Sequence, residues 1–401
     1  MSTKYPGGII SKTAPVPSGP YQSSTASGIW TLDQMEYWMA QGLWPTAGNT
    51  ASFLYGWGRS NYGQLGLGNT TSYSSPKQVG SLSGWLKITG NYTGLAIKTD
   101  GTLWAWGYNF YGQAGLGNTT DYSSPKQVGA LTTWSSVSDQ GNGFTLAIKT
   151  NGTLWSWGKN VQGQLGLGNT TNYSSPKQVG ALTNWSLVSA STNTSAAIKT
   201  DGTLWTWGYG VYGQLGLGNQ TNYSSPKQVG ALTTWATVSI KESSILAVKT
   251  DGTLWSWGSN SYGELGFGNT TYYSSPKQVG ALTNWLKVSA AKYYSAAIKT
   301  DGTLWTWGLN SGGNLGLNNR TTYSSPKQVG SLTTWSKVDI GNGASCAIKT
   351  DGTLWAWGGN SYGQSGLGNT TSYSSPKQVG SLTGWSVVVS GTFSMLGIAV
   401  V

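Results

Sequence analysis

The side chains that enzymes use most often for acid–base and metal chemistry are scarce in this chain. It has no His, which is the commonest general base and the commonest metal ligand. Its one Cys, Cys346, excludes an intramolecular disulfide and a thiolate metal cluster. The 12 Asp and Glu residues are scattered, and no nucleophile is spaced so that it pairs with a base. We therefore expect no catalytic residues, no metal site and no cofactor.

One acidic residue does recur at a fixed place, in the phrase KTDG. The five copies that carry Asp there are at Asp100, Asp201, Asp251, Asp301 and Asp351. Asn151 fills the same place in a sixth copy. A calcium-binding or catalytic carboxylate needs partners at a fixed distance, and no second carboxylate recurs. Asp and Asn before Gly are both typical of hairpin turns, so the pattern predicts a structural turn.

Three other recurring motifs can be interpreted as chemistry or as structure. The glycine-rich Gly213–Asn219 suggests a phosphate loop, but no GK[ST] follows it, and turn glycines are favoured. The N-x-[ST] sequences at Asn69 and six later places would accept glycans in a eukaryotic secreted protein; otherwise they predict polar turns. Tryptophan pairs such as Trp104 and Trp106 would suit sugar platforms, but their alternation in every copy favours packing between repeats.

These motifs belong to a repeat of about 50 residues. The tryptophans of the WG pairs are Trp57, Trp106, Trp157, Trp207, Trp257, Trp307 and Trp357, spaced by 49, 51 and then four times 50 residues. Between Lys199 and Ala247 one unit contains about four short runs typical of strands, separated by Gly and Pro turns, and no convincing helix. Seven such units predict an all-β, seven-bladed β-propeller.

The two ends of the repeat array complement each other. The segment Met395–Val401 matches the strand that precedes KTDG elsewhere but has no hairpin partner after it. The segment Ala51–Gly58 matches the strand that follows KTDG but has no strand before it. We expect these N- and C-terminal strands to pair and close the ring, which hides two sheet edges that would otherwise favour aggregation.

The phrase GTLWTWGYGVYGQLGLGN, which begins at Gly202, resembles the regulator of chromosome condensation (RCC1) repeat, with its WG-x-N and GQLG-x-G elements. The resemblance covers residues 51–401 and recurs seven times. It implies a seven-bladed propeller closed by strands from both ends of the chain. Members of this family include nucleotide exchange factors, domains of ubiquitin ligases and an inhibitor of β-lactamase, so the resemblance implies a fold rather than one function.

Residues 1–50 differ from the rest and are expected to form an N-terminal arm. They hold five of the 12 prolines and begin as an extended segment. Residues 31–45 predict one short helix, capped by Thr31 and Gln34. The segment GIWTLDQMEYWMAQGLWP resembles a module of marine bacteriophage structural proteins, which implies attachment to other virion or surface proteins. The candidate attachment residues are Trp30, Leu32, Met35, Trp38, Met39 and Trp44.

The seven units agree almost letter for letter, except in two short windows. One window lies just before the strand that leads into KTDG, and the other follows WG. In an RCC1-like blade the first window is a turn near the central shaft, so its seven copies would surround one mouth. Neutral drift of exposed loops explains the variation equally well. The candidate ligand-binding residues are Asn91, Tyr92, Asn142, Phe144, Asn193, Lys241, Glu242, Tyr293, Tyr294, Asn342 and Phe393.

Charge and composition narrow the choice of partners. The formal net charge is +11, but 13 of the 23 basic residues are repeat lysines that return about every 25 residues and form no cluster. We therefore expect no nucleic-acid partner. No apolar run is long enough to cross a membrane, and the N-terminus has no apolar stretch of signal-peptide length. Only 9% of residues are charged, against about 25% in an average soluble protein, which suits a particle or an extracellular setting.

The sequence thus predicts a non-enzymatic structural or binding protein. The first hypothesis is a virion decoration or tail-fibre-like appendage protein, assembled in the host cytoplasm, whose propeller recognises a host glycan or surface protein. The alternative is an extracellular bacterial propeller that binds glycans or proteins, like a lectin or an inhibitor.

Overall fold

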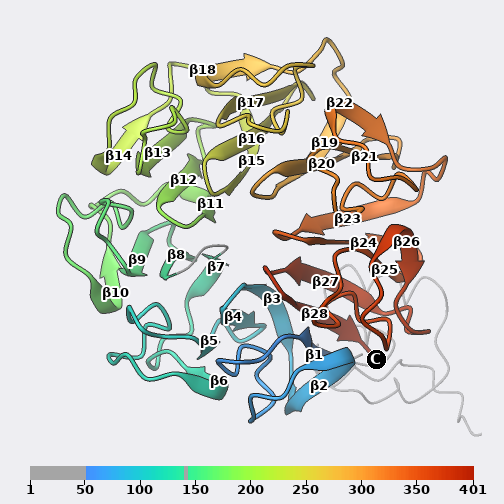
Figure 1. The fold of residues 1–401 in the computed structure, drawn as a ribbon. Coiled ribbons are helices and arrows are strands. Elements are labelled where there is room, and N and C mark those ends of the chain that lie inside the picture. Colours follow the sequence, from blue (N-terminus) through green and yellow to red (C-terminus); the bar gives the residue numbers. More distant parts are fainter. Residues whose placement is uncertain (1–50, 140–142) are drawn as a thin grey trace, which may run out of the picture. The chain divides into compact units, whose positions relative to one another are not determined.

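Seven four-stranded antiparallel sheets are arranged in a ring in the computed structural model of this protein (Figure 1). The structure describes residues 51–139 and 143–401, and Ser52–Val400 form one compact unit. No helix occurs among the described residues. The predicted all-β propeller with seven blades is therefore confirmed. The predicted arm of residues 1–50, with its helix, lies outside the described residues.

Each blade presents its strands in the same order from the centre outwards. The innermost strands are β3 (Trp85–Gly90), β7 (Trp134–Ser138), β11 (Trp185–Ala190), β15 (Trp235–Lys241), β19 (Trp285–Ala290), β23 (Trp335–Ile340) and β27 (Trp385–Ser390). The second strands are β4 (Thr93–Lys98), β8 (Phe144–Lys149), β12 (Thr194–Lys199), β16 (Ser244–Lys249), β20 (Tyr294–Lys299), β24 (Ala344–Lys349) and β28 (Ser394–Val400). The third strands are β5 (Leu103–Gly107), β9 (Leu154–Gly158), β13 (Leu204–Gly208), β17 (Leu254–Gly258), β21 (Leu304–Gly308), β25 (Leu354–Gly358) and β1 (Ser52–Gly58). The outermost strands are β6 (Tyr122–Gln127), β10 (Tyr173–Gln178), β14 (Tyr223–Gln228), β18 (Tyr273–Gln278), β22 (Tyr323–Gln328), β26 (Tyr373–Gln378) and β2 (Tyr73–Ser83).

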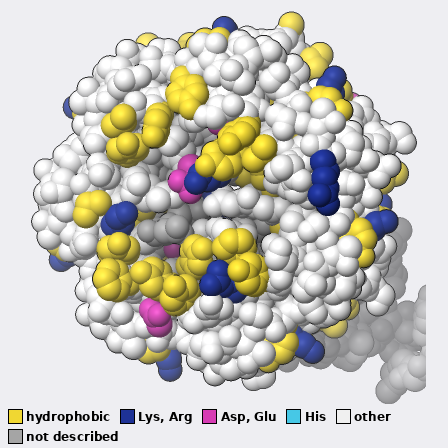
Figure 2. Space-filling view, in the orientation of Figure 1, with side chains coloured by type: hydrophobic (Ala, Val, Ile, Leu, Met, Phe, Trp, Pro, Cys, Tyr) yellow, Lys and Arg dark blue, Asp and Glu magenta, His cyan; other side chains and the backbone are white. Residues whose placement is uncertain are grey.

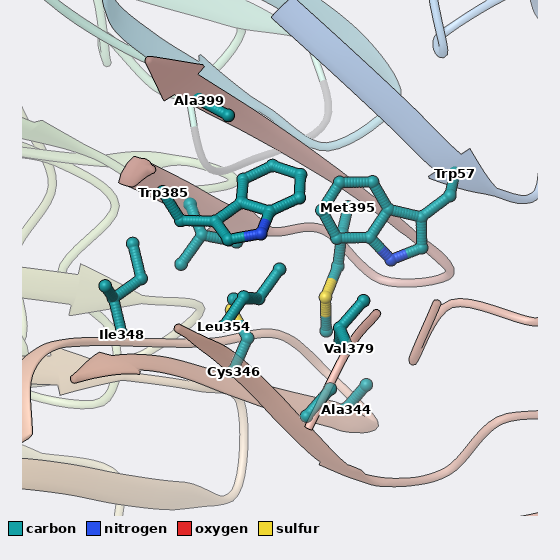
Figure 3. Packing of buried hydrophobic residues seen from close by; sticks show 11 residues of the cluster. Trp57, Ala344, Cys346, Ile348, Leu354, Val379, Trp385, Met395 and Ala399 are labelled. Atoms are coloured by element: carbon teal, nitrogen blue, oxygen red, sulfur yellow. The ribbon is translucent and has the colours of Figure 1, made fainter. Parts of the chain in front are cut away.

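The seventh blade is built from both ends of the propeller chain. Its sheet has the order β2-β1-β28-β27, and β1 pairs with β28 in continuous register from Ser52 opposite Val400 to Gly58 opposite Ser394. Trp57 of β1 packs edge-on against Trp385 of β27, with ring centroids 5.7 Å apart (Figure 3). The predicted closure of the ring is confirmed, and the two edges it hides cannot pair with another chain.

The tryptophan of each WG pair links neighbouring blades. Its indole Nε1–H donates to a backbone carbonyl of the preceding blade, at 2.8–3.0 Å in all seven copies. In one copy, Trp257 bonds to Gln214. A Cβ on Gly216 would lie only 2.7 Å from the Trp257 Nε1, so this GQLG glycine leaves room for the indole. These tryptophans are fully buried, which favours packing between blades over a sugar platform.

A belt of hydroxyl groups joins the innermost strands. Each accepts a hydrogen bond from a backbone N–H of the next blade: Thr89 from Asp139, Ser138 from Ala190, Ser189 from Ile240, Ser239 from Ala290 and Ser289 from Ile340. In the sixth blade Asp339 replaces the hydroxyl and accepts from the Ser390 N–H. Val389 holds the seventh position and cannot accept. There Asn91 accepts from the Thr392 N–H at 2.6 Å and from the Ser394 hydroxyl at 3.2 Å.

The KTDG phrases form the hairpin turns between second and third strands, as predicted. The Asp251 Oδ1 accepts from the Thr253 N–H and from its hydroxyl, and Gly252 has a φ of 76°. A Cβ on Gly252 would lie 2.0 Å from the Thr283 carbonyl oxygen. Asn151 holds its turn in the same way, through Thr153. The recurring carboxylates are therefore structural.

These turns predict a sensitivity to acid. Hydrogen bonds from the threonine two residues on lower the pKa of each turn carboxyl, in Asp100, Asp201, Asp251, Asp301 and Asp351. Because these pKa values are lower in the folded chain than in the unfolded chain, their contribution to stability is present above about pH 4 and is lost as the pH falls through the folded values. We expect the thermal midpoint to fall below about pH 4, and to fall less in a variant with all five residues changed to Asn. An unchanged acid response in that variant would contradict this role.

Candidate functional site at the variable face

Both variable windows lie at the same end of the blades. Ser244, the first residue of β16, pairs with Gly258, the last residue of β17. The inner hairpin before β16 and the loop after β17 therefore meet, and the KTDG turn lies at the opposite end of the same two strands. We call the end with the inner hairpins and the loops between third and outermost strands the variable face. We call the end with the KTDG turns the repeat face.

A constant backbone hydrogen bond holds the two windows together. The residue after each WG donates its N–H to a carbonyl of the inner hairpin, at 2.7–2.9 Å. The seven donor–acceptor pairs are Arg59–Phe393, Tyr108–Tyr92, Lys159–Gly143, Tyr209–Asn193, Ser259–Ser243, Leu309–Tyr293 and Gly359–Gly343. Each blade thus presents the same pair of backbone positions with different side chains, so the face varies chemically around a constant backbone contact.

A pocket of about 380 Å³ lies on this face, beside the closing blade, and is lined by residues between 59 and 192. Two cationic residues line it, Arg59 after β1 and Lys159 after β9. Its other lining residues are four tyrosines and one threonine: Tyr62, Tyr92, Tyr108, Tyr111 and Thr192. None of the described residues that line it is Asp or Glu. Figure 2, which views the variable face, shows hydrophobic side chains with Lys and Arg among them around the centre of the ring.

Aromatic rings hold the Arg59 side chain. Its guanidinium carbon lies 5.0 Å from the centroid of the Tyr362 ring and 5.5 Å from that of Phe393, within the range of cation–π attraction. Both rings belong to the C-terminal part of the propeller chain, so the environment of Arg59 depends on closure. The Arg59 Nε is buried and has no hydrogen-bond partner among the described residues.

Three of the four tyrosines form one continuous wall of the pocket. The Tyr62 ring lies 4.8 Å from the Tyr108 ring and 6.0 Å from the Tyr92 ring, measured between centroids. Burial raises the pKa of the Tyr92 phenol, so this group is neutral at neutral pH. On the far wall, the Lys159 Nζ lies 5.5 Å from the centroid of the Tyr111 ring.

Lys159 is held by a neutral group. Its Nζ donates to the Asn193 Oδ1 at 3.3 Å. Burial lowers the pKa of the Lys159 ammonium. The two cations of the pocket therefore rest on aromatic rings and on an amide rather than on a lining carboxylate.

A second aromatic cluster lies on the same face. The Tyr293 and Tyr262 rings are 4.9 Å apart, and the Lys292 Nζ lies 5.0 Å from the Tyr293 centroid. A hydrogen bond with Tyr293, and then the charge of Glu242, raise the pKa of Lys292. Glu242 has a φ of 51°, unusual for a residue other than glycine, and so the inner hairpin of this blade has its own shape.

The structure brings several predicted residues to the variable face and buries others. Tyr92, Asn193, Glu242, Tyr293, Asn342 and Phe393 are half-buried in the inner hairpins. Four others were expected at the surface but are buried: Phe144, Tyr294, Asn91 and Lys241. Asn142 lies outside the described residues.

The four corrections have physical reasons. Phe144 and Tyr294 are the first residues of β8 and β20 and point between blades, where the Tyr294 hydroxyl donates to the Ala344 carbonyl at 3.0 Å. Asn91 accepts hydrogen bonds from Thr392 and Ser394 of the seventh blade, which joins the first blade to the seventh. Burial lowers the pKa of Lys241, and the nearby carboxylates, Asp339 first, oppose that shift.

Residues of the second window were missing from the predicted site. These are Arg59, Tyr62, Tyr108, Tyr111 and Lys159. The signal that could have found them is the variation of the four residues after WG, which read RSNY, YNFY and KNVQ in these three blades.

Metal binding and thiolate chemistry find little support in the described part of the chain. No group of three or more His, Cys, Asp and Glu side chains lies together there in a way that could hold a metal ion. Cys346 is fully buried, and burial raises the pKa of its thiol well above the ordinary value, which suppresses thiolate chemistry. Within residues 51–139 and 143–401, no helix is long and apolar enough to span a bilayer.

Fold and site together define a seven-bladed β-propeller with one repeated and one variable face. The regulator of chromosome condensation (RCC1) repeat matches residues 53–91, 100–148, 151–198, 201–241, 251–298, 301–348 and 351–396. A second description of the same repeat matches residues 135–164, 185–214, 235–264 and 335–364. The chain belongs to this family.

Solved structures with the same fold are similar in shape but distant in sequence. Human WBSCR16 is 21% identical, with a TM-score of 0.77 over 87% of this chain and 99% of that one. Prp20p from Saccharomyces cerevisiae, studied with its binding to Gsp1p and histones, is 18% identical, with a TM-score of 0.77 over 87% of this chain and 92% of that one. Yeast RCC1 (Prp20) bound to Kap60 gives the same identity and score, over 87% and 89%. At these identities the likeness concerns the fold.

Proposed function

We propose that this protein is a binding protein without catalytic activity, which recognises its ligand with the variable face. The observation that carries this proposal is the contrast between the two faces. The KTDG turns of the repeat face occur in six blades and change only at Asn151, and the outermost-strand phrase SSPKQVG is the same in all seven blades. The donor positions of the constant backbone bond, by contrast, hold Arg, Tyr, Lys, Ser, Leu and Gly. Side chains that differ on a rigid scaffold are typical of recognition surfaces.

The setting that we propose is a virus particle, on which the protein is a decoration or appendage and residues 1–50 attach it. The resemblance of residues 28–45 to a module of bacteriophage structural proteins supports this setting, as does the low content of charged residues. Prp20p, in the same fold family, is described with protein partners, which agrees with a binding role.

Binding is tested with a panel of immobilised bacterial surface polysaccharides and glycans. We expect saturable binding, weakened about tenfold or more when Tyr62 and Tyr92 are both changed to Ala, because truncated aromatic anchors typically lose 1–2 kcal/mol or more. The matched control is Leu232→Ala; Leu232 is 46% exposed and lies outside both windows. Equal binding by all three proteins would contradict recognition by the variable face.

Attachment is tested separately, by removing residues 1–50. We expect the shortened chain to remain a folded propeller and to be absent from purified particles. Continued incorporation would exclude the arm as the attachment device. A chain that binds glycans but is never found in particles would favour the alternative, an extracellular bacterial propeller.

A further inference from the structure

We propose that the pocket between Arg59 and Lys159 binds an acidic sugar unit, a pyranose ring that carries a carboxylate. This inference rests on the proposed recognition by the variable face and specifies the chemistry of its ligand. Three features carry it: the uncompensated charge of the pocket, the fixed position of the guanidinium, and the aromatic walls.

The charge of the pocket is positive and has no counterpart in its lining. Arg59 and Lys159 contribute two cationic groups, and no lining residue is acidic. Asp121 interacts with Tyr108, but its Oδ1 accepts the Asn109 N–H at 2.7 Å, which ties this carboxylate to the backbone outside the pocket lining. Cations without a paired anion at a concave surface attract an anionic ligand and gain hydrogen bonds when it arrives.

The Arg59 side chain is fixed before any ligand binds. Tyr362 and Phe393 lie against the guanidinium. The backbone N–H of Arg59 donates to the Phe393 carbonyl at 2.9 Å. The Arg59 Nε is buried without an acceptor among the described residues, and no Asp or Glu is among the described residues that line the pocket. A planar guanidinium in a fixed position suits the two oxygens of a carboxylate, which it can bind through parallel hydrogen bonds.

The walls suit a sugar ring better than a bare anion or a long chain. Tyr62, Tyr92, Tyr108 and Tyr111 present ring surface together with hydroxyl groups, and the volume of about 380 Å³ is at the small end for ligand pockets. Tyrosine offers apolar faces for C–H groups and a polar tip for hydroxyls. A nucleic-acid strand would instead need a continuous basic groove, and the chain has only two arginines, Arg59 and Arg320.

The test compares charged and neutral sugars on the full chain. Calorimetric titration measures the affinity for two carboxylate sugars, 3′-sialyllactose and a glucuronic-acid disaccharide. Lactose is the neutral control, and lactose sulfate is the control with a different anion. We expect one site that binds at least one carboxylate sugar tenfold or more tighter than lactose and lactose sulfate. Arg59→Gln is expected to weaken this binding tenfold or more, and Lys159→Gln about threefold or more.

The matched control is Arg320→Gln, because it removes the same charge from an exposed position away from the pocket. Thermal unfolding confirms that each variant is folded. If Arg59→Gln does not fold, Lys159→Gln still tests the charge of the pocket.

Equal losses of binding in Arg59→Gln and Arg320→Gln would show unspecific attraction and overturn the proposal. A preference for lactose or lactose sulfate would overturn the acidic-sugar class while leaving recognition by the variable face intact. Loss of all glycan binding only in the tyrosine double variant, with Arg59→Gln unaffected, would also overturn it.

Discussion

Replacing Trp257 by Ala is expected to lower the free energy of unfolding by about 3–5 kcal/mol, the usual cost of removing a fully buried tryptophan. Trp257 is 0% exposed, and it packs with Trp235 at 5.9 Å between centroids. Its loss opens a cavity between two blades. It also leaves the Gln214 carbonyl without the indole N–H that it accepts at 3.0 Å. Denaturant unfolding followed by tryptophan fluorescence and circular dichroism measures the change.

Two controls separate the contributions of the indole. Trp257→Phe keeps an aromatic ring between the blades and removes the donor, so its loss of stability should be smaller than that of the Ala variant. Tyr262→Ala removes an aromatic ring from a position that is 39% exposed and paired with Tyr293, and should change stability by about 1 kcal/mol or less. If Trp257→Ala were no more harmful than Tyr262→Ala, the indoles would not be what holds the blades together.

The fold was predictable because the physical signals repeat. An Asp-Gly hairpin, a WG strand and a Pro-containing edge strand recur with one period, and each copy confirms the others. Closure was predictable for the same reason, since Met395–Val401 and Ala51–Gly58 are complementary parts of one unit. The hydroxyl belt was not predicted, although a Ser stands at this position in four of the seven blades. Ser and Thr are frequent throughout the repeats, so one hydroxyl residue per blade does not indicate a hydrogen bond to the next blade.

The site was only partly predictable because burial in the inner hairpins changes within one or two residues. Tyr92 precedes β4 and is half-buried, whereas Phe144 begins β8 and is fully buried. Successive side chains of a strand point to opposite faces, so a shift of one residue in the assumed strand start exchanges core and surface. Arg59 was missed for another reason. Its aromatic neighbours, Tyr362 and Phe393, are about 300 residues away in the chain and come close only when the ring closes.

Closure leads to the second large prediction, which concerns the strand β28. Deleting residues 394–401 is expected to abolish the cooperatively folded propeller. The deletion removes Met395, Leu396 and Ile398, each no more than 4% exposed. Burial of such a side chain contributes about 1.5–3 kcal/mol, and three of them approach the whole stability of a typical domain, about 5–15 kcal/mol. It also exposes the backbone edges of β1 and β27, which are open to pairing with other chains.

Thermal unfolding and size-exclusion chromatography test this expectation, with deletion of Val401 alone as the control, since that residue is 62% exposed. The control should unfold at the temperature of the full chain, and the longer deletion should aggregate or unfold without a sharp transition. A synthetic peptide of residues 394–401 should restore part of the transition, because the gap in the sheet accepts a strand from outside as it accepts β28. A truncated chain that stays monomeric and unfolds as sharply as the full chain would mean that the blades hold the ring without this strand. Pairing of β1 with β28 would then not be what stabilises the closed ring.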